Sequence, residues 1–365
     1  MTNRLFRTVP ILTLVLICVG TVAKAQSSKR FADSIRMAFN IPELNYAVVS
    51  SAGVMEMEAL GFKKHHTNNK AALSDQFRIG SNTKTVTSYL AFGMVKKGII
   101  QWDTKFFDLY PELKSQSNKA YHHLTLKDLL TMRARLMSWT YTYTEPTQQQ
   151  IKGTEQQQRY AFLSWIMRQP PLAGNRTYYF SNPSYVAAGM MLEKVSGKDY
   201  KTLVQDLGKE LAIEFGFGQP NFKDINQPWG HNADLEPEKP SDNYKLNWLS
   251  SAGNINVSLQ DYVKFIQLQL LGLAGKSSLL SAEEFYTMYF GLPQFAYGWN
   301  WYVDEESKMK YAWHTGNPGS FFTKVYVCKE TDKAFIFFAN VGSEQVENGI
   351  NLLFEHLKKK YSKRL

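Results

Sequence analysis

Alternating apolar and polar positions near both ends of the chain predict β-strands, whereas the middle shows helical spacing. The strand-like runs are residues 45–51, 54–62, 297–303, 321–327 and 334–339. The first two runs flank Ser51-Ala52-Gly53, which is a hairpin signal. We therefore expect one sheet built from the N- and C-terminal parts of the chain, with mainly helical structure inserted between them.

Apolar residues spaced three or four apart predict the principal helices. These cover residues 31–39, 124–130, 183–195, 258–271 and 344–360. Thr125 and Ser258 are suited to cap two of them, and Asn182 before Pro183 predicts an N-cap followed by a first helical residue. Residues 220–243 are rich in Pro, Asn, Asp and Gly, which predicts a long loop.

The N-terminal segment has the features of a signal peptide, over residues 1–25. It has a positive start at Arg4 and Arg7, an apolar run over residues 11–19 and an Ala-x-Ala site ending at Ala25. The apolar run is short for a membrane span, so we expect export to the periplasm or the extracellular space with no span after cleavage. Lipid attachment at Cys18 is disfavoured because the bulky Ile17 precedes it.

The remaining chain divides into a sheet domain and an insertion. We expect residues 26–115 and 250–365 to form the sheet domain, with residues 116–249 as an inserted, mainly helical domain. Removal of the signal peptide lowers the formal net charge from +10 to +7. No nucleic-acid motif accompanies this charge, and basic residues at the C-terminal end are interpreted as solvated. Cys328 is the single mature cysteine, so no internal disulfide is expected.

Ser81-Asn82-Thr83-Lys84 is the stretch that suggests chemistry. Apolar residues follow at helical spacing, and Gly98 stands where that helix would end. On a helix, Ser81 and Lys84 would share a face. A desolvated lysine has a lowered pKa and can take the proton of a serine hydroxyl, and the backbone N–H groups at a helix start suit a developing oxyanion. On its own, however, Ser-x-x-Lys also occurs on surface helices.

Three later stretches strengthen the catalytic interpretation. Residues 178–185 place Asn182 at a helix start beside aromatic rings, and residues 249–254 are a turn of small residues. Residues 313–319 contain His314-Thr315-Gly316 followed by Asn317, between two strand-like runs. This stretch can place a histidine or a hydroxyl at a strand edge, with a free backbone N–H at Asn317.

Together, these motifs resemble the serine β-lactamase and penicillin-binding protein superfamily, and most closely its class C β-lactamases, D-aminopeptidases and related esterases. The resemblance spans roughly residues 35–355. It implies an α/β (α+β) fold of the β-lactamase/transpeptidase type, in which helices flank an antiparallel sheet and a mainly helical domain is inserted. It also implies an exported serine hydrolase that acts on an amide or ester through an acyl-enzyme.

The resemblance further assigns roles to individual residues. Ser81 would be the nucleophile and Lys84 its base, while Asn182 would orient Lys84 and the substrate. His314-Thr315-Gly316 stands where the family has Lys-Thr-Gly. The N–H groups of Ser81 and Asn317 would form the oxyanion hole.

The chain departs from the family pattern at two places. The family's Tyr-x-Asn is Phe180-Ser181-Asn182 here, and a phenylalanine cannot transfer a proton. Tyr179 is one residue away and is the alternative proton shuttle. Residues 132–135 read Met-Arg-Ala-Arg where relatives usually read His-Thr-Ser-Gly, which predicts a different substrate preference.

Two functions remain open from the sequence. The first is the active hydrolase, with a β-lactam, a D-amino-acid peptide or a small ester as substrate. The second is a non-catalytic relative that binds peptidoglycan-like peptides, which Phe180 favours. Either would take a small molecule or short peptide as partner and needs no cofactor. The histidine pairs at 65–66 and 122–123 lack metal-ligand spacing, so a zinc hydrolase is disfavoured.

Overall fold

The computed structural model describes residues 28–242, 244–277 and 279–362. The signal-peptide prediction for residues 1–25 lies outside this range, as do Lys363 and Arg364 of the basic tail. Among the described residues, no helix combines the length and apolarity needed to cross a bilayer. Within the same part of the chain, Cys328 is a free, buried cysteine on a strand.

A six-stranded antiparallel sheet joins the two ends of the chain, as the alternation predicts. Its spatial order is β2-β1-β9-β8-β7-β6. The strands are β1 (Glu43–Ser50), β2 (Gly53–Gly61), β6 (Asn300–Val303), β7 (Lys310–Gly316), β8 (Phe322–Cys328) and β9 (Lys333–Ala339). The expected hairpin is confirmed, with Ser50 opposite Gly53. N-terminal β1 pairs directly with C-terminal β9.

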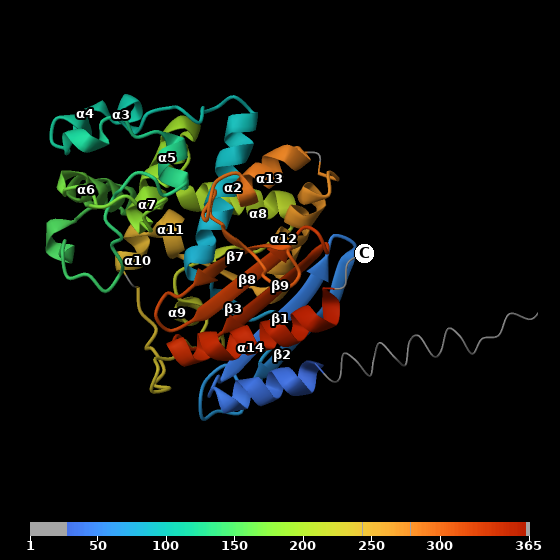
Figure 1. The fold of residues 1–365 in the computed structure, drawn as a ribbon. Helices are drawn as coiled ribbons and strands as arrows, with labels where there is room; N and C mark the ends of the chain where they lie inside the picture. Colours follow the sequence, from blue (N-terminus) through green and yellow to red (C-terminus); the bar gives the residue numbers. More distant parts are fainter. Residues whose placement is uncertain (1–27, 243, 278, 363–365) are drawn as a thin grey trace, which may run out of the picture.

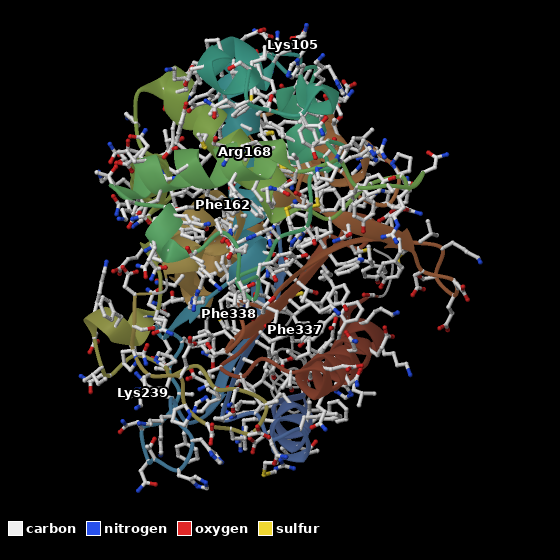
Figure 2. The ribbon with its side chains drawn as sticks, turned by 90° about the vertical axis from the view of Figure 1, so that its left-hand side faces the viewer. Lys105, Phe162, Arg168, Lys239, Phe337 and Phe338 are labelled. Carbon is white, nitrogen blue, oxygen red and sulfur yellow. The ribbon has the colours of Figure 1, made fainter. Side chains whose placement is uncertain are left out.

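Each face of this sheet carries its own layer of helices (Figure 1). The helix over residues 28–38 and α14 (Glu344–Tyr361) cover one face, and α12 (Leu259–Leu273) packs on the other. Neighbouring residues of β9 serve the two layers, because side chains alternate along a strand. Phe337 belongs to the core beneath α14, and Phe338 belongs to the core shared with α12 (Figure 2).

The middle of the chain is mainly helical, as expected. Its helices are α2 (Thr83–Lys96), α3 (Phe106–Leu109), α4 (Pro111–Lys114), α5 (Leu126–Leu130), α6 (Glu155–Arg168), α7 (Asn182–Ser196), α8 (Tyr200–Leu211), α9 (Pro220–Lys223), α10 (Tyr244–Trp248), α11 (Ser250–Gly253) and α13 (Ala282–Phe290). Short 3₁₀ turns are η1 (Gly80–Asn82), η2 (Lys119–Tyr121) and η3 (Gln148–Gln150). Antiparallel β3 (Gln76–Arg78), β5 (Ile255–Ser258) and β4 (Gly216–Phe217) form a small second sheet in the order β3-β5-β4.

Most helix boundaries follow the capping signals, with one instructive exception. Thr125 and Ser258 cap α5 and α12, as predicted. The prediction that Asn182 caps α7 was wrong. Ser181 is the N-cap, its Oγ accepting from the backbone N–H of Ser184, and Asn182 is the first helical residue. The Asn182 carboxamide is thereby free to reach Lys84. The proposed domain boundaries at residues 116 and 249 stay a prediction.

Candidate active site

Lys84 lies at the centre of the candidate site, fully buried on the first turn of α2. Its Nζ is 2.8 Å from Ser81 Oγ, 2.8 Å from Asn182 Oδ1 and 2.7 Å from the carbonyl oxygen of Ala252. These partners come from η1, α7 and α11, so three separate elements converge on one amine.

The surroundings of Lys84 favour its neutral amine. Burial is the cause that holds the pKa of Lys84 well below its ordinary value. A neutral amine has two N–H groups and one lone pair. The oxygens of Asn182 and Ala252 can only accept, so they take the two N–H groups. The lone pair is then left for the hydroxyl proton of Ser81, which is the arrangement a general base needs.

Ser81 is held in place by contacts on both sides of it. Gly80, just before it, has a φ of +49°, a conformation that glycine adopts without strain. Asn82, just after it, donates Nδ2 to Thr323 Oγ1 on β8 at 2.8 Å. Thr323 Oγ1 in turn donates to the carbonyl of Ile79 at 3.0 Å. These bonds tie η1 to the main sheet and fix the position of the nucleophile.

The end of β7 lies directly against η1. A Cβ placed on Gly316 would lie 1.9 Å from the carbonyl oxygen of Ile79, so only glycine permits this approach. A Cβ placed on Gly80 would lie 2.9 Å from the backbone nitrogen of Asn317. The Asn317 N–H is therefore next to the residue that precedes Ser81. The structure thus brings together the two residues whose N–H groups are the candidate oxyanion donors.

His314 and Thr315, two neighbouring residues of β7, each have a buried polar atom without a hydrogen-bond partner. His314 is buried, and its Nδ1 has no hydrogen-bond partner. The Oγ1 of Thr315 is likewise buried and unpaired. Burial, followed by the charge of Lys84, lowers the pKa of His314 to about 3, so its imidazole is neutral at physiological pH. Buried polar atoms are usually paired, so unpaired ones beside a nucleophile indicate groups kept for a ligand.

Tyr179 and Phe180 point in opposite directions from an extended segment. Tyr179 is buried, and its hydroxyl donates to the carbonyl of Gly174 and accepts from the N–H of Arg176. Phe180 is 44% exposed, and its ring centre lies 5.4 Å from Lys84 Nζ. The structure therefore does not bring Tyr179 to Lys84. The ring at the family's shuttle position is that of Phe180, which has no hydroxyl. The Tyr185 ring also lies near the amine, 5.7 Å from its centre to Lys84 Nζ, but its hydroxyl donates to the carbonyl of Leu130.

Comparison with known proteins decides the family. The β-lactamase family model matches residues 32–357. The chain belongs to the β-lactamase family. Family membership agrees with the resemblance seen in the sequence, and the antiparallel sheet flanked by helices is the β-lactamase/transpeptidase fold.

The individual proteins that resemble this chain are distant from it in sequence. "Protein flp" of Staphylococcus aureus (strain NCTC 8325 / PS 47) is 21% identical over 87% of this chain, which spans 62% of that relative's length. The octameric penicillin-binding protein homologue from Pyrococcus abyssi is 18% identical, with a TM-score of 0.74 over 93% of this chain and 79% of its own. A class C β-lactamase from Rhodobacter sphaeroides is 16% identical, with a TM-score of 0.71 over 90% of this chain and 99% of its own.

The 132–135 segment of this β-lactamase-family chain contacts the stretch that leads into β6. Arg133 donates Nη1 to the carbonyl of Phe295 at 3.0 Å and Nη2 to that of Pro293 at 3.2 Å. Phe295 in turn meets the ring of His314 edge-on, with 6.4 Å between ring centres. The segment thus supports one side of the site through Arg133.

Two contributors to the site have no clear signal in the sequence. The Ala252 carbonyl lies in a run of small residues, and a backbone acceptor has no side-chain signature. Thr323 has the pattern of an ordinary strand residue, although its hydroxyl links Asn82 to Ile79. Among the described residues, no group of three or more His, Cys, Asp or Glu is placed to hold a metal ion.

Proposed function

We propose that this protein is a serine hydrolase that cleaves an amide or ester through an acyl-enzyme on Ser81. The observation that carries the proposal is the environment of Lys84, a buried amine whose two acceptor partners leave its lone pair to the Ser81 hydroxyl. Membership of the β-lactamase family supports a serine-hydrolase type of chemistry.

Acylation follows from this geometry. Ser81 Oγ attacks the substrate carbonyl carbon while its proton passes to Lys84 Nζ. The carbonyl oxygen becomes an oxyanion, which accepts from the N–H groups of Ser81 and Asn317. When the tetrahedral intermediate collapses, the bond to the leaving amine or alcohol breaks. The leaving group takes the proton from Lys84, and the acyl group remains on Ser81.

Deacylation repeats these steps with water. Water attacks the acyl carbon, its proton passes to a base, and Ser81 Oγ leaves with a proton to regenerate the free enzyme. The family's phenol is absent, so we assign the relay at this step to Lys84 assisted by His314. The neutral imidazole of His314 keeps an unpaired Nδ1. It also lies close enough to Lys84 for the positive charge of a protonated Lys84 to lower the pKa of His314.

We propose that the enzyme acts outside the cytoplasm after removal of residues 1–25, on a small molecule or short peptide. β-Lactams, D-amino-acid peptides and small esters all present a carbonyl that Ser81 can attack. One fold can serve many such reactions, so the family alone does not select among them.

A second candidate is a non-catalytic protein that binds peptidoglycan-like peptides. The observation that favours it is Phe180, whose ring lies beside Lys84 with no hydroxyl to relay a proton. Such a protein would keep the pocket and bind ligands, and it would either fail to acylate or would hold the acyl group without releasing it.

Covalent labelling tests the proposed function. Mature protein is incubated with a fluorophosphonate and, separately, with a fluorescent penicillin, and intact mass is recorded. Attachment of one probe is expected in the wild type and is expected to be absent from Ser81→Ala. Lys84→Met should lower the labelling rate by at least about 10²-fold, because the serine loses its base.

Ser196→Ala is the matched control, since Ser196 lies at the far end of α7 and bonds only to the backbone of its own helix and of Lys198. It should label as the wild type does. Absence of labelling by both probes would contradict the hydrolase proposal and favour the non-catalytic binder. Labelling that persists in Ser81→Ala would place the nucleophile elsewhere.

A further inference from the structure

The side chain of Arg133 anchors the loop that leads into β6. Its Nη1 donates to the carbonyl oxygens of Thr131 at 2.8 Å and Phe295 at 3.0 Å, and its Nη2 donates to that of Pro293 at 3.2 Å. All three of these acceptors are backbone groups, so the contact fixes where the main chain runs. A planar guanidinium can hold two carbonyls of one loop in a fixed geometry, which a single ammonium on a flexible stem cannot.

The anchored loop, residues 293–298, contains a backbone conformation that needs support from outside the loop. Gln294 has a φ of +64°. A non-glycine residue at such a φ is strained, and it persists only where its surroundings hold it in place. The two loop carbonyls that Arg133 holds belong to Pro293 and Phe295, the residues on either side of Gln294. Arg133 is therefore placed to hold the strained residue.

The same loop carries two groups that contact His314. The Phe295 ring meets the imidazole edge-on, with 6.4 Å between ring centres, and the backbone of Gly298 forms a hydrogen bond with the imidazole. Gly298 also packs against Lys84, because a Cβ placed on Gly298 would lie 2.9 Å from the carbonyl oxygen of Lys84. The loop therefore joins the Arg133 guanidinium to both His314 and Lys84.

Tyr178 holds the Phe295 ring from a second side. The two rings are stacked, with 5.2 Å between their centres, and Tyr178 donates its hydroxyl to Asn300 Oδ1 at 3.1 Å. Asn300 belongs to β6, which pairs with β7, the strand that carries the imidazole. The Phe295 ring is thus fixed by Tyr178 at its face and by Arg133 through its backbone, and it keeps its place beside the imidazole.

We propose that Arg133 is a positioning residue, which sets the orientation of the His314 imidazole by holding the 293–298 loop against it. An imidazole relays a proton efficiently only when its free nitrogen keeps a fixed distance and direction to the reacting atoms. His314 has such a nitrogen, since its Nδ1 is buried without a hydrogen-bond partner. The effect on deacylation rests on the proposed hydrolase, in which His314 assists Lys84, whereas the orientation of the ring does not.

The orientation of His314 is tested first, without turnover. Imidazole ¹⁵N spectra of the mature chain are recorded between pH 4 and pH 8, and His314→Gln identifies the His314 signals among the seven histidines. In the wild type these signals should not titrate in this range, because burial and the charge of Lys84 hold the pKa of His314 at about 3. In Arg133→Met the released ring gains access to water, so its pKa should rise and a titration should appear.

Two further variants separate positioning from a general loss of structure. Phe295→Leu removes the ring edge and leaves the carbonyls that Arg133 holds, so it should expose His314 as Arg133→Met does, and it carries the test if Arg133→Met fails to fold. Arg135→Met is the matched control. Arg135 is exposed on the same segment and donates Nε to the carbonyl of Leu172 at 2.7 Å. Its loss removes a guanidinium–carbonyl bond of the same kind outside the 293–298 loop, and should leave the His314 signals unchanged.

The consequence for the reaction is measured next with nitrophenyl acetate, whose burst reports acylation and whose steady state reports deacylation. Arg133→Met should slow deacylation by at least about tenfold, since it disturbs a proton relay, and should change the acylation rate by less than about threefold. Arg133→Lys keeps the charge without the planar fork and should recover part of the lost rate. Arg168→Met, exposed on α6 (Figure 2), should match the wild type.

Equal losses in acylation and deacylation, or equal effects of Arg133→Met and Arg135→Met, would overturn the positioning role. An unchanged His314 spectrum in both Arg133→Met and Phe295→Leu would overturn it whatever the rates. Exposure of His314 in Arg133→Met, together with no labelling of Ser81 in the wild type, would refute the proposed hydrolase and leave the positioning of the ring standing.

Discussion

Lys84 Nζ and Asn182 Oδ1 meet at 2.8 Å across a sequence separation of 98 residues. The Asn182 carboxamide is itself fixed, because its Nδ2 donates to the carbonyl of Trp139 at 2.9 Å. Its oxygen is thereby directed at Lys84. A carboxamide holds the amine without bringing a negative charge to it, so the lysine can stay buried and basic.

Asn182→Asp should therefore change how the reaction depends on pH. A carboxylate beside Lys84 favours the ammonium and raises the pKa of that lysine. Since the neutral amine is the base, the rising limb of Ser81 labelling by a fluorophosphonate should move to higher pH, by about one unit or more. The measurement is the labelling rate between pH 5 and pH 10. Asn226→Asp, on an exposed loop, is the control. An unshifted profile would show that the Lys84 amine is not the base.

Phe180→Tyr should restore a proton relay. The ring centre lies 5.4 Å from Lys84 Nζ, so a phenol there would carry its hydroxyl into the site. General acid–base catalysis typically contributes about 10²–10⁴-fold, and we expect ester hydrolysis to rise by at least about tenfold, mostly in deacylation. Burst and steady-state phases separate the two steps. Phe222→Tyr, exposed on α9, should have no effect. A fall in rate would mean that the native chemistry excludes a phenol.

Gly316→Ala should displace the oxyanion donor without unfolding the protein. The new methyl group would lie 1.9 Å from the Ile79 carbonyl oxygen and force β7 away from η1. Loss of one oxyanion donor typically costs about 10²–10³ in kcat, and a loss in this range is expected. Gly93→Ala is the matched control, because no atom lies within 4 Å of its added methyl. Circular dichroism checks the fold, and full activity in Gly316→Ala would remove Asn317 from the mechanism.

Arg159→Met should destabilise the helix that presents Asn182. Arg159 and Glu193 form a buried ion pair between α6 and α7, and Glu193 also accepts from the N–H of Tyr200 at 2.8 Å. Removing the arginine leaves a buried carboxylate unpaired, which typically costs about 3–5 kcal/mol. Urea denaturation at pH 7 measures the change in the free energy of unfolding.

Two further variants identify the cause of that loss. Arg159→Met/Glu193→Gln should recover much of the stability, because the uncompensated charge is gone. Lys209→Met removes an exposed ion pair with Asp206 and should leave the urea midpoint almost unchanged. Burial already raises the pKa of Glu193, and Arg159 opposes that rise. In Arg159→Met, the Glu193 carboxylate of the folded state should therefore bind a proton more readily than in the wild type. The loss in the free energy of unfolding caused by Arg159→Met should then become smaller as pH falls.

Local patterns in the sequence determined much of this fold. Alternation located the β1–β2 hairpin and strands β8 and β9, and the hydroxyls of Thr125 and Ser258 marked the starts of α5 and α12. These features depend on neighbours a few residues away, which a sequence displays directly. Strand β7 was harder to recognise, because it combines a polar motif with its role as an inner strand between β6 and β8.

Long-range contacts decided the rest. From the sequence, Phe180 stands at the expected shuttle position and Tyr179 one residue before it, but successive side chains of an extended segment point in opposite directions. The backbone there turns Tyr179 toward Gly174 and Phe180 toward Lys84. The spacing of Ser81 and Lys84 can be read directly from the sequence, whereas the basicity of Lys84 cannot. That property arises from complete burial and from two oxygen acceptors, on Asn182 and Ala252, that only folding brings to the amine.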